Sequence, residues 1–171
     1  MNSVFPENNP VASNCIDGVT TYANCQVSNQ CHPYLCITWN HNKDWLVITV
    51  TGYSVDKVVV YNRLYGAQEL INNAKLIYSN DFEGTSIIYQ SSFGSSASAV
   101  YTFDFNKVVT YVRIQQTTNE LINLVEVELY NKNNKIPLSG SLINIIIIII
   151  IIHHYHHHSI ISSYELGIPR E

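Results

Sequence analysis

The segment YVRIQQTTNELINLVEVELY, residues 111–130, contains two stretches in which apolar and polar side chains alternate. Apolar residues recur at every second position in residues 111–116, and again in residues 124–129. A period of two is typical of β-strands that bury one face and expose the other. The residues between the two stretches, TTNE, favour a turn or loop. The segment therefore predicts two β-strands joined by a loop.

Similar signals recur upstream of this segment. Further predicted strands, separated by turn residues, are Trp45–Thr51, Val55–Tyr61, Ala74–Ser79, Thr85–Tyr89 and the alternating run around Tyr101, Phe103 and Phe105. A turn is expected at Asn80-Asp81, and a Ser/Gly loop at Ser91–Ser98. Only Gln68–Asn73 indicates a helical turn, and residues 1–44 show no sustained period and are expected to be loops. Short strands spaced by turns indicate an antiparallel sandwich or barrel.

Composition limits the classes of function. The 171 residues suit one domain, and charged residues make up only 13%, about half the usual share. A net charge of −4, with no basic stripe, argues against nucleic-acid binding. The twelve tyrosines suit either ligand recognition or half-buried strands. No nucleophile elbow, phosphate loop or H-E-x-x-H motif indicates catalysis.

The four cysteines lie between positions 15 and 36, and they allow two disulfides in three pairings. An alternative is a zinc site formed by Cys31, His32, Cys36 and His41, although this spacing is not that of a standard zinc finger. The first fifteen residues lack the basic and apolar regions of a secretory signal peptide, and no N-x-S/T sequon occurs. Secretion is therefore not predicted from these residues.

The C-terminal segment differs from the rest of the chain. Ile145–Ile152 are eight consecutive isoleucines, followed by HHYHHH. Isoleucine, histidine and serine are the three reading frames of an ATC repeat, which indicates a translated microsatellite. A membrane anchor and a histidine metal site are the alternatives, although the apolar run is short for a bilayer span. Residues 132–171 are accordingly expected to be a low-complexity Ile/His-rich tail, disordered or prone to aggregation.

Three more segments join the first in a characteristic order: NCIDG (14–18), DWLVITVTGYSVDKVVVYNR (44–63) and LINNAKLIY (70–78). Together the four resemble the galactose-binding-like, discoidin or coagulation-factor type C domains, and most of all the fucolectin branch. The resemblance implies a jelly-roll β-sandwich of about eight antiparallel strands over residues 14–131, after a lead-in at 1–13. The lead-in is shorter than the family's, so either the first strand is missing or residues Cys25–Asn42 rebuild that edge. An open edge would favour association of copies.

The resemblance also implies carbohydrate-binding residues. Arg63 stands where the family has its first pocket arginine, and its forked guanidinium can donate several hydrogen bonds to sugar hydroxyls. The alternative is that Arg63 pairs with Glu69, Asp56 or a loop carbonyl. His41 is a candidate for the pocket histidine, and His32 is another.

The chain also departs from the fucose-binding pattern. Tyr65 replaces an Asp of that branch, and Leu70 stands near the position of its second pocket arginine. Specificity for fucose is therefore not expected to be retained. Tyr61, Tyr65 and Gln68 are candidate contributors to an altered pocket.

A calcium ion is the cofactor that the resemblance implies, with Asn14, Asp17 and Glu126 as ligands, although Val19 replaces a further ligand asparagine. Calcium takes six to eight oxygen ligands, and here it would join the N-terminal loop to a strand near the C-terminal end. The alternative is that Asp17 forms a turn with Gly18 and that Glu126 is a solvated carboxylate.

The resemblance thus implies a non-catalytic, lectin-like module that binds glycans or glycoproteins and contacts membranes only peripherally, if at all. It also implies an extracellular or cell-surface location. The alternatives are a protein- or phospholipid-binding adhesion module, with Tyr34, Leu35 and Trp39 as protruding loop residues, and a degenerate structural domain.

Overall fold

The computed structural model describes residues 12–21, 35–38, 43–50, 53–63 and 66–138. In these residues the chain forms nine β-strands and two short 3-10 helices, η1 (Ala12–Ile16) and η4 (Gln68–Ile71). The strands are β1 (Cys36–Ile37), β2 (Trp45–Thr49), β3 (Ser54–Asn62), β4 (Lys75–Ser79), β5 (Ile87–Ser92), β6 (Val100–Val108), β7 (Tyr111–Gln115), β8 (Asn123–Asn131) and β9 (Asn134–Lys135). The helical turn expected at Gln68–Asn73 is confirmed as η4.

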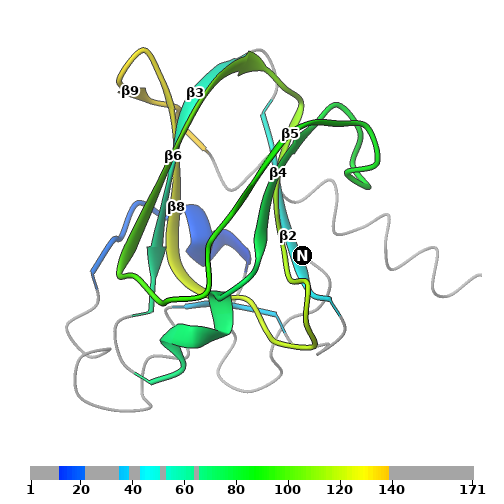
Figure 1. The fold of residues 1–171 in the computed structure, drawn as a ribbon. Coiled ribbons are helices and arrows are strands. Elements are labelled where there is room, and N and C mark those ends of the chain that lie inside the picture. The colour runs from blue at the N-terminus through cyan, green and yellow to red at the C-terminus, as the bar shows by residue number, and fades with distance from the viewer. Residues whose placement is uncertain (1–11, 22–34, 39–42, 51–52, 64–65, 139–171) are drawn as a thin grey trace, which may run out of the picture.

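The strands form two antiparallel sheets that face one another as a sandwich (Figure 1). One sheet has five strands in the order β1-β8-β3-β6, with β9 also paired to β8. The other has four strands in the order β2-β7-β4-β5. Strands far apart in sequence are neighbours in both sheets, as β3 and β8 are. The prediction of an all-β antiparallel sandwich is confirmed.

The core lies between the two inner faces, because each strand places alternate side chains there. The five-stranded sheet contributes Val58, Val60, Val127 and Leu129, and the four-stranded sheet contributes Leu46, Ile48, Leu76, Tyr78, Val112 and Ile114, all at most 3% exposed. The rings of Tyr78 and Phe105 stack across the two sheets, with their centroids 3.9 Å apart. The alternating apolar positions of the sequence therefore form one continuous core.

The edge of the five-stranded sheet is built by β1, whose Cys36 pairs with Leu124 of β8. β1 lies within residues 25–42, so the segment predicted to rebuild this edge does supply an edge strand. A disulfide between Cys15 and Cys36 joins η1 to β1. The zinc site that included Cys36 is therefore wrong, and so is the expectation that residues 1–44 are entirely loops.

The C-terminal part of the sandwich extends beyond the boundary that was expected at residue 131. β9 pairs with β8, and Ile136, only 3% exposed, belongs to the core. The polyisoleucine run and the histidine cluster lie outside the described residues. In the described part of the chain, no helix is long and apolar enough to cross a membrane.

Candidate functional site

The end of β3 is held in place by a buried asparagine. Asn62, 1% exposed, accepts a hydrogen bond from the backbone nitrogen of Arg63 (2.9 Å). Its side-chain nitrogen donates to the carbonyl oxygens of Gln68 and Ser98, at 3.0 Å each. Its backbone nitrogen donates to the carbonyl of Ala99 (2.9 Å). The end of β3, η4 and the loop before β6 therefore meet at one side chain, which fixes the backbone of Arg63.

The Arg63 side chain is only 7% exposed, and its Nε atom is buried. No described residue accepts a hydrogen bond from this Nε. Burial lowers the pKa of Arg63, and the charge of Glu69 opposes that change. Glu69 thus acts on Arg63 through its charge. Asp56 was the other acid predicted as an alternative partner of Arg63. It accepts a hydrogen bond from the backbone nitrogen of Lys132.

Arg113, the other buried arginine of the described residues, differs from Arg63 in its partners. Its Nε donates to Gln115 Oε1 (3.0 Å) and its Nη1 to the carbonyl of Phe82 (3.2 Å). Its guanidinium carbon also lies 4.5 Å from the centre of the Trp45 ring. These contacts explain Arg113 as a structural residue that holds the loop after β4. They leave Arg63 as the buried arginine whose Nε donates to no described residue.

Among the other residues predicted to bind sugar, Gln68 lies close to the Arg63 backbone, because its carbonyl accepts a hydrogen bond from Asn62. His41 and Tyr65 lie outside the described residues. The Tyr61 hydroxyl donates to Glu128 Oε2 (3.0 Å), and burial together with this bond raises its pKa to about 12. Tyr61 is therefore already engaged by a carboxylate on the outer face of the five-stranded sheet.

Glu128 is the centre of this outer-face network. Its Oε2 accepts hydrogen bonds from Tyr61 and from Tyr130 (2.8 Å), and its Oε1 lies 2.7 Å from Lys135 Nζ. Burial favours its neutral form, but the hydrogen bonds from Lys135, Tyr130 and Tyr61 outweigh that effect and lower its pKa. Lys57 stands over the Tyr130 ring, 4.3 Å from its centre. Glu128 is thus a fixed anion in the folded protein.

The structure brings part of the predicted calcium set together. Asp17 Oδ1 accepts a hydrogen bond from the backbone nitrogen of Val19 (2.8 Å), which confirms the alternative of a turn around Gly18. The nitrogen of Gly18 donates to Glu126 Oε1 (3.1 Å), so this turn lies against β8. Asn14 donates through Nδ2 to the carbonyl of Leu35 (3.3 Å).

Glu126 itself is 0% exposed, so the expectation of a solvated carboxylate is wrong. Burial raises its pKa to about 8; the Lys135 charge and the Gly18 hydrogen bond act against that rise, and the charges of Asp17 and Glu128 add to it. Its Oε2 atom is buried and has no partner among the described residues.

These residues do not fit a calcium ion well. The described part of the chain contains no group of three or more His, Cys, Asp or Glu side chains that could hold a metal. A cation is also already present, because Lys135 Nζ lies 3.6 Å from Glu126 Oε1. A divalent ion bound to Glu126 would stand close to this ammonium group, and like charges at such a distance repel.

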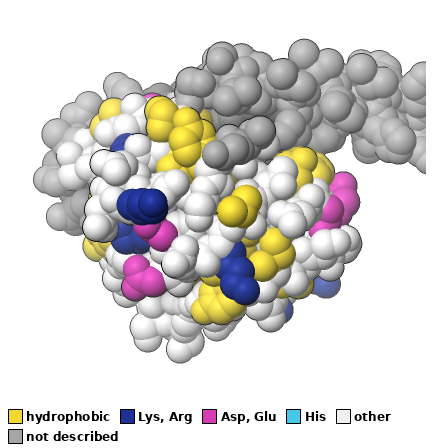
Figure 2. All heavy atoms as spheres, turned by 90° about the horizontal axis from the view of Figure 1, so that it is seen from above, with side chains coloured by type: hydrophobic (Ala, Val, Ile, Leu, Met, Phe, Trp, Pro, Cys, Tyr) yellow, Lys and Arg dark blue, Asp and Glu magenta, His cyan; other side chains and the backbone are white. Residues whose placement is uncertain are grey.

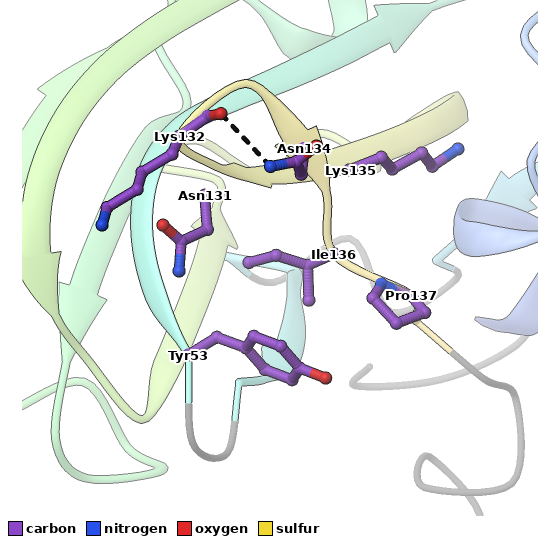
Figure 3. Close-up of a pocket in the computed structure, with 7 residues that line it drawn as sticks. All are labelled: Tyr53, Asn131, Lys132, Asn134, Lys135, Ile136 and Pro137. Atoms are coloured by element: carbon purple, nitrogen blue, oxygen red, sulfur yellow. Dashed lines mark hydrogen bonds between the residues drawn. The ribbon is translucent and has the colours of Figure 1, made fainter.

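A hollow lies at the end of the sandwich opposite Arg63, beside the β9 hairpin (Figure 3). It has a volume of about 350 Å³, and Tyr53, Asn131, Lys132, Asn134 and Ile136 are among its lining residues. Tyr53 is 41% exposed and could stack on a sugar ring. Figure 2 views the molecule from this end and shows lysine, acidic and apolar side chains interspersed over its described part. This face therefore lacks the single basic patch that nucleic-acid binding would need.

Sequence reasoning missed two residues that the structure makes important. Asn62 precedes Arg63 in the quoted motif, but its three-way role depends on η4, six residues on, and on the loop before β6, 36 residues on. Lys135 lies seven residues after Glu128, beyond the expected domain boundary. The clue in the sequence was a two-residue hairpin turn at Lys132-Asn133. In the structure both residues have positive φ angles, 48° and 66°, as this class of hairpin turn requires.

Comparison with known proteins places the fold. No protein-family model matches the chain, and no curated protein sequence matches it. Among solved structures, a fucose binding module of Streptococcus pneumoniae is 19% identical with a TM-score of 0.63, over 78% of this chain and 93% of that one. The lectin domain of lectinolysin, in complex with Lewis b antigen, is 22% identical with a TM-score of 0.60, over 76% and 89%.

An F-lectin (fucolectin) from the serum of striped bass, Morone saxatilis, is 21% identical with a TM-score of 0.59. That match covers 74% of this chain and 44% of the bass protein. The chain therefore has the galactose-binding-like β-sandwich fold of these carbohydrate-binding lectin domains.

Proposed function

We propose that the chain is a non-catalytic glycan-binding module that receives its ligand at the end of β3, where Arg63 lies. The observation that supports this location is the buried Nε of Arg63, which no described residue uses as a donor. A buried donor without an acceptor is costly, and a ligand oxygen can remove that cost. The anchoring by Asn62 keeps the backbone of Arg63 in place before the ligand arrives, so little ordering is needed on binding.

The proposed ligands are hydroxyl-rich sugars at the ends of glycans or glycoproteins. The structures that share the fold include a fucose binding module and a lectin domain bound to Lewis b antigen. A sugar without charge is held by several directional hydrogen bonds, and a guanidinium can supply more than one. Leu70 and Tyr65 replace polar residues of the fucose-binding pattern, so we propose a sugar preference that differs from that branch, with Gln68, His41 and Tyr65 as further candidate contacts.

The acidic pair on β8 supports a binding role over glycoside hydrolysis. Glu128 is held by Lys135, Tyr130 and Tyr61, and Glu126 is fully buried. Hydrolysis needs two carboxyl groups that flank an accessible bond, with room for water or for nucleophilic attack. The oxygens of Glu128 are thus engaged by neighbouring side chains and Glu126 is shielded from solvent, so the pair does not flank an accessible bond.

The test is a glycan array with the full-length wild type, Arg63→Lys, Arg63→Met and Tyr53→Ala. Arg63→Lys keeps the charge and removes the fork, and Arg63→Met keeps most of the stem. We expect both to lose affinity at least about tenfold for the glycan that wild type binds, which is about 1.4 kcal/mol. Tyr53→Ala, at the opposite hollow, should bind as wild type does, provided that melting temperatures show all variants to be folded.

Two other outcomes would change the proposed binding site or the proposed class of ligand. Loss of binding in Tyr53→Ala alone would move the site to the hollow beside β9. Binding to vesicles or proteins that free sugars do not compete with would favour an adhesion module. For that alternative, Leu35 was expected to protrude and is instead fully buried, and Tyr34 and Trp39 lie outside the described residues.

A further inference from the structure

The N-terminal loop meets the outer face of β8 at a single buried carboxyl group. The backbone nitrogen of Gly18 donates a hydrogen bond to Glu126 Oε1. Gly18 has a positive φ of 85°, a backbone conformation that favours glycine. The turn is closed by Asp17, which accepts from Val19. The contact joins residues 108 positions apart, so whatever stabilises it also holds the Asp17–Gly18 turn onto β8.

The cation beside this contact belongs to the chain itself. Lys135 Nζ lies 2.7 Å from Glu128 Oε1 and 3.6 Å from Glu126 Oε1. It also lies 3.9 Å from the point that a Cβ on Gly18 would occupy, so the ammonium group borders the loop as well as both carboxyl groups. Lys135 also lines the hollow beside β9, and Figure 3 shows its ammonium end pointing away from Tyr53 and Ile136.

The position of this ammonium group is set by the fold. Lys135 pairs with Tyr130 in the β8–β9 hairpin, and the next residue, Ile136, is buried and donates to the carbonyl of Leu129 (2.7 Å). The lysine backbone is therefore anchored on both sides. Its side chain is 39% exposed, so the ammonium keeps part of its hydration while it contacts the two acids.

We propose that the ammonium group of Lys135 takes the place of a divalent cation in this fold and holds the Asp17–Gly18 turn onto β8. The fold is then stable without calcium, although the sequence resemblance implies a calcium ion at Asn14, Asp17 and Glu126. A tethered cation of one charge needs fewer oxygen ligands than calcium, which takes six to eight. The two carboxyl groups of β8 supply the acceptors that this ammonium group uses. This inference goes beyond the proposed glycan binding and does not rest on it.

The experiment is thermal unfolding of the full-length protein in EDTA and in millimolar calcium chloride, at matched ionic strength. The variants are Lys135→Met, which removes the charge and keeps the stem, and Lys132→Met as a control from the same hairpin, where the side chain is exposed. We expect wild type and Lys132→Met to melt at the same temperature in EDTA and in calcium. Lys135→Met should melt about 3–6 °C lower than wild type in EDTA.

Lys135→Arg keeps the positive charge and should restore most of the melting temperature that Lys135→Met loses. A fall in the wild-type melting temperature in EDTA, reversed by calcium, would overturn the proposal, and this result needs no variant. Equal melting temperatures for Lys135→Met and Lys132→Met would overturn it as well. Melting does not measure sugar binding, so failure here is distinguishable from failure of the glycan array.

Discussion

Asn62 accepts, through its side-chain oxygen, a hydrogen bond of 2.9 Å from the backbone nitrogen of its neighbour Arg63. The same side chain donates to two carbonyl oxygens from other segments, at 3.0 Å each. The strand end that carries the proposed sugar donor is therefore fixed by a residue that need not touch the sugar. Replacing Asn62 should therefore affect both stability and binding.

Asn62→Ala removes one acceptor and both donors and leaves two carbonyl oxygens without these partners. We expect a loss of about 2–3 kcal/mol in the free energy of unfolding, measured by urea denaturation. Asn62→Asp keeps the acceptor but cannot donate to Gln68 and Ser98, so it should lose a similar amount. Asn134→Ala, at an exposed position of the β9 hairpin, is the matched control and should change stability by less than about 0.5 kcal/mol. An Asn62→Ala protein as stable as this control would refute the anchoring role.

Asp81 should give the protein a stability that depends on pH in the acid range. Its carboxylate accepts hydrogen bonds from the backbone nitrogen of Thr85 (2.9 Å), from the Thr85 hydroxyl (3.1 Å) and from the backbone nitrogen of Ser86. The bond from the Thr85 backbone is the largest cause that lowers the Asp81 pKa from 3.8 to about 2. A depressed pKa in the folded state means that the stabilisation is present above pH 4 and is lost as the pH falls towards 2.

The measurement for Asp81 is the melting temperature of wild type and of Asp81→Asn from pH 2 to pH 7. We expect wild type to melt higher than the variant at pH 7, and the difference to shrink between pH 4 and pH 2. A difference that stays constant over this range would show that the carboxylate charge does not contribute.

Gly84 lies under the Arg113 side chain. It has a φ of +71°, and a Cβ there would stand 3.1 Å from Arg113 Cδ. Gly84→Ala should therefore combine backbone strain with displacement of the arginine from Phe82 and Trp45, and we expect a loss of about 2–3 kcal/mol in urea denaturation. Gly94→Ala is the control: its φ is +79°, but no heavy atom lies within 4 Å of the added Cβ, so only strain, about 1 kcal/mol, is expected. Equal losses in the two variants would show that the Arg113 contact carries no cost.

The sequence predicted the long strands well because their periodicity is a local property. β7 and β8 were visible in the alternation of residues 111–130, and β4 was predicted within one residue of its observed start. β5 begins at Ile87, later than the expected Thr85, because Thr85 and Ser86 first hydrogen-bond to the Asp81 carboxylate. That interaction belongs to the turn, and a strand propensity cannot reveal it.

The site was predicted less completely, because burial of polar groups depends on distant segments. Alternation placed Glu126 on the outer face of its strand, which is correct, but that face is covered by the turn at Gly18. The two-residue strand β1 is too short to carry a period, and it forms only through pairing with β8. The roles of Asn62 and Lys135 likewise arise from partners that the topology brings together.

The disulfide between Cys15 and Cys36 has a consequence for how such a module can change over time. Both cysteines lie in segments that contact β8 or pair with it, so the two ends of the intervening chain are fixed independently of its length. The entropy of closing a loop grows only with the logarithm of its length. Insertions and deletions between residues 22 and 34 should therefore cost little stability, and this stretch is where new binding specificity could be grafted onto the module without rebuilding its sheets.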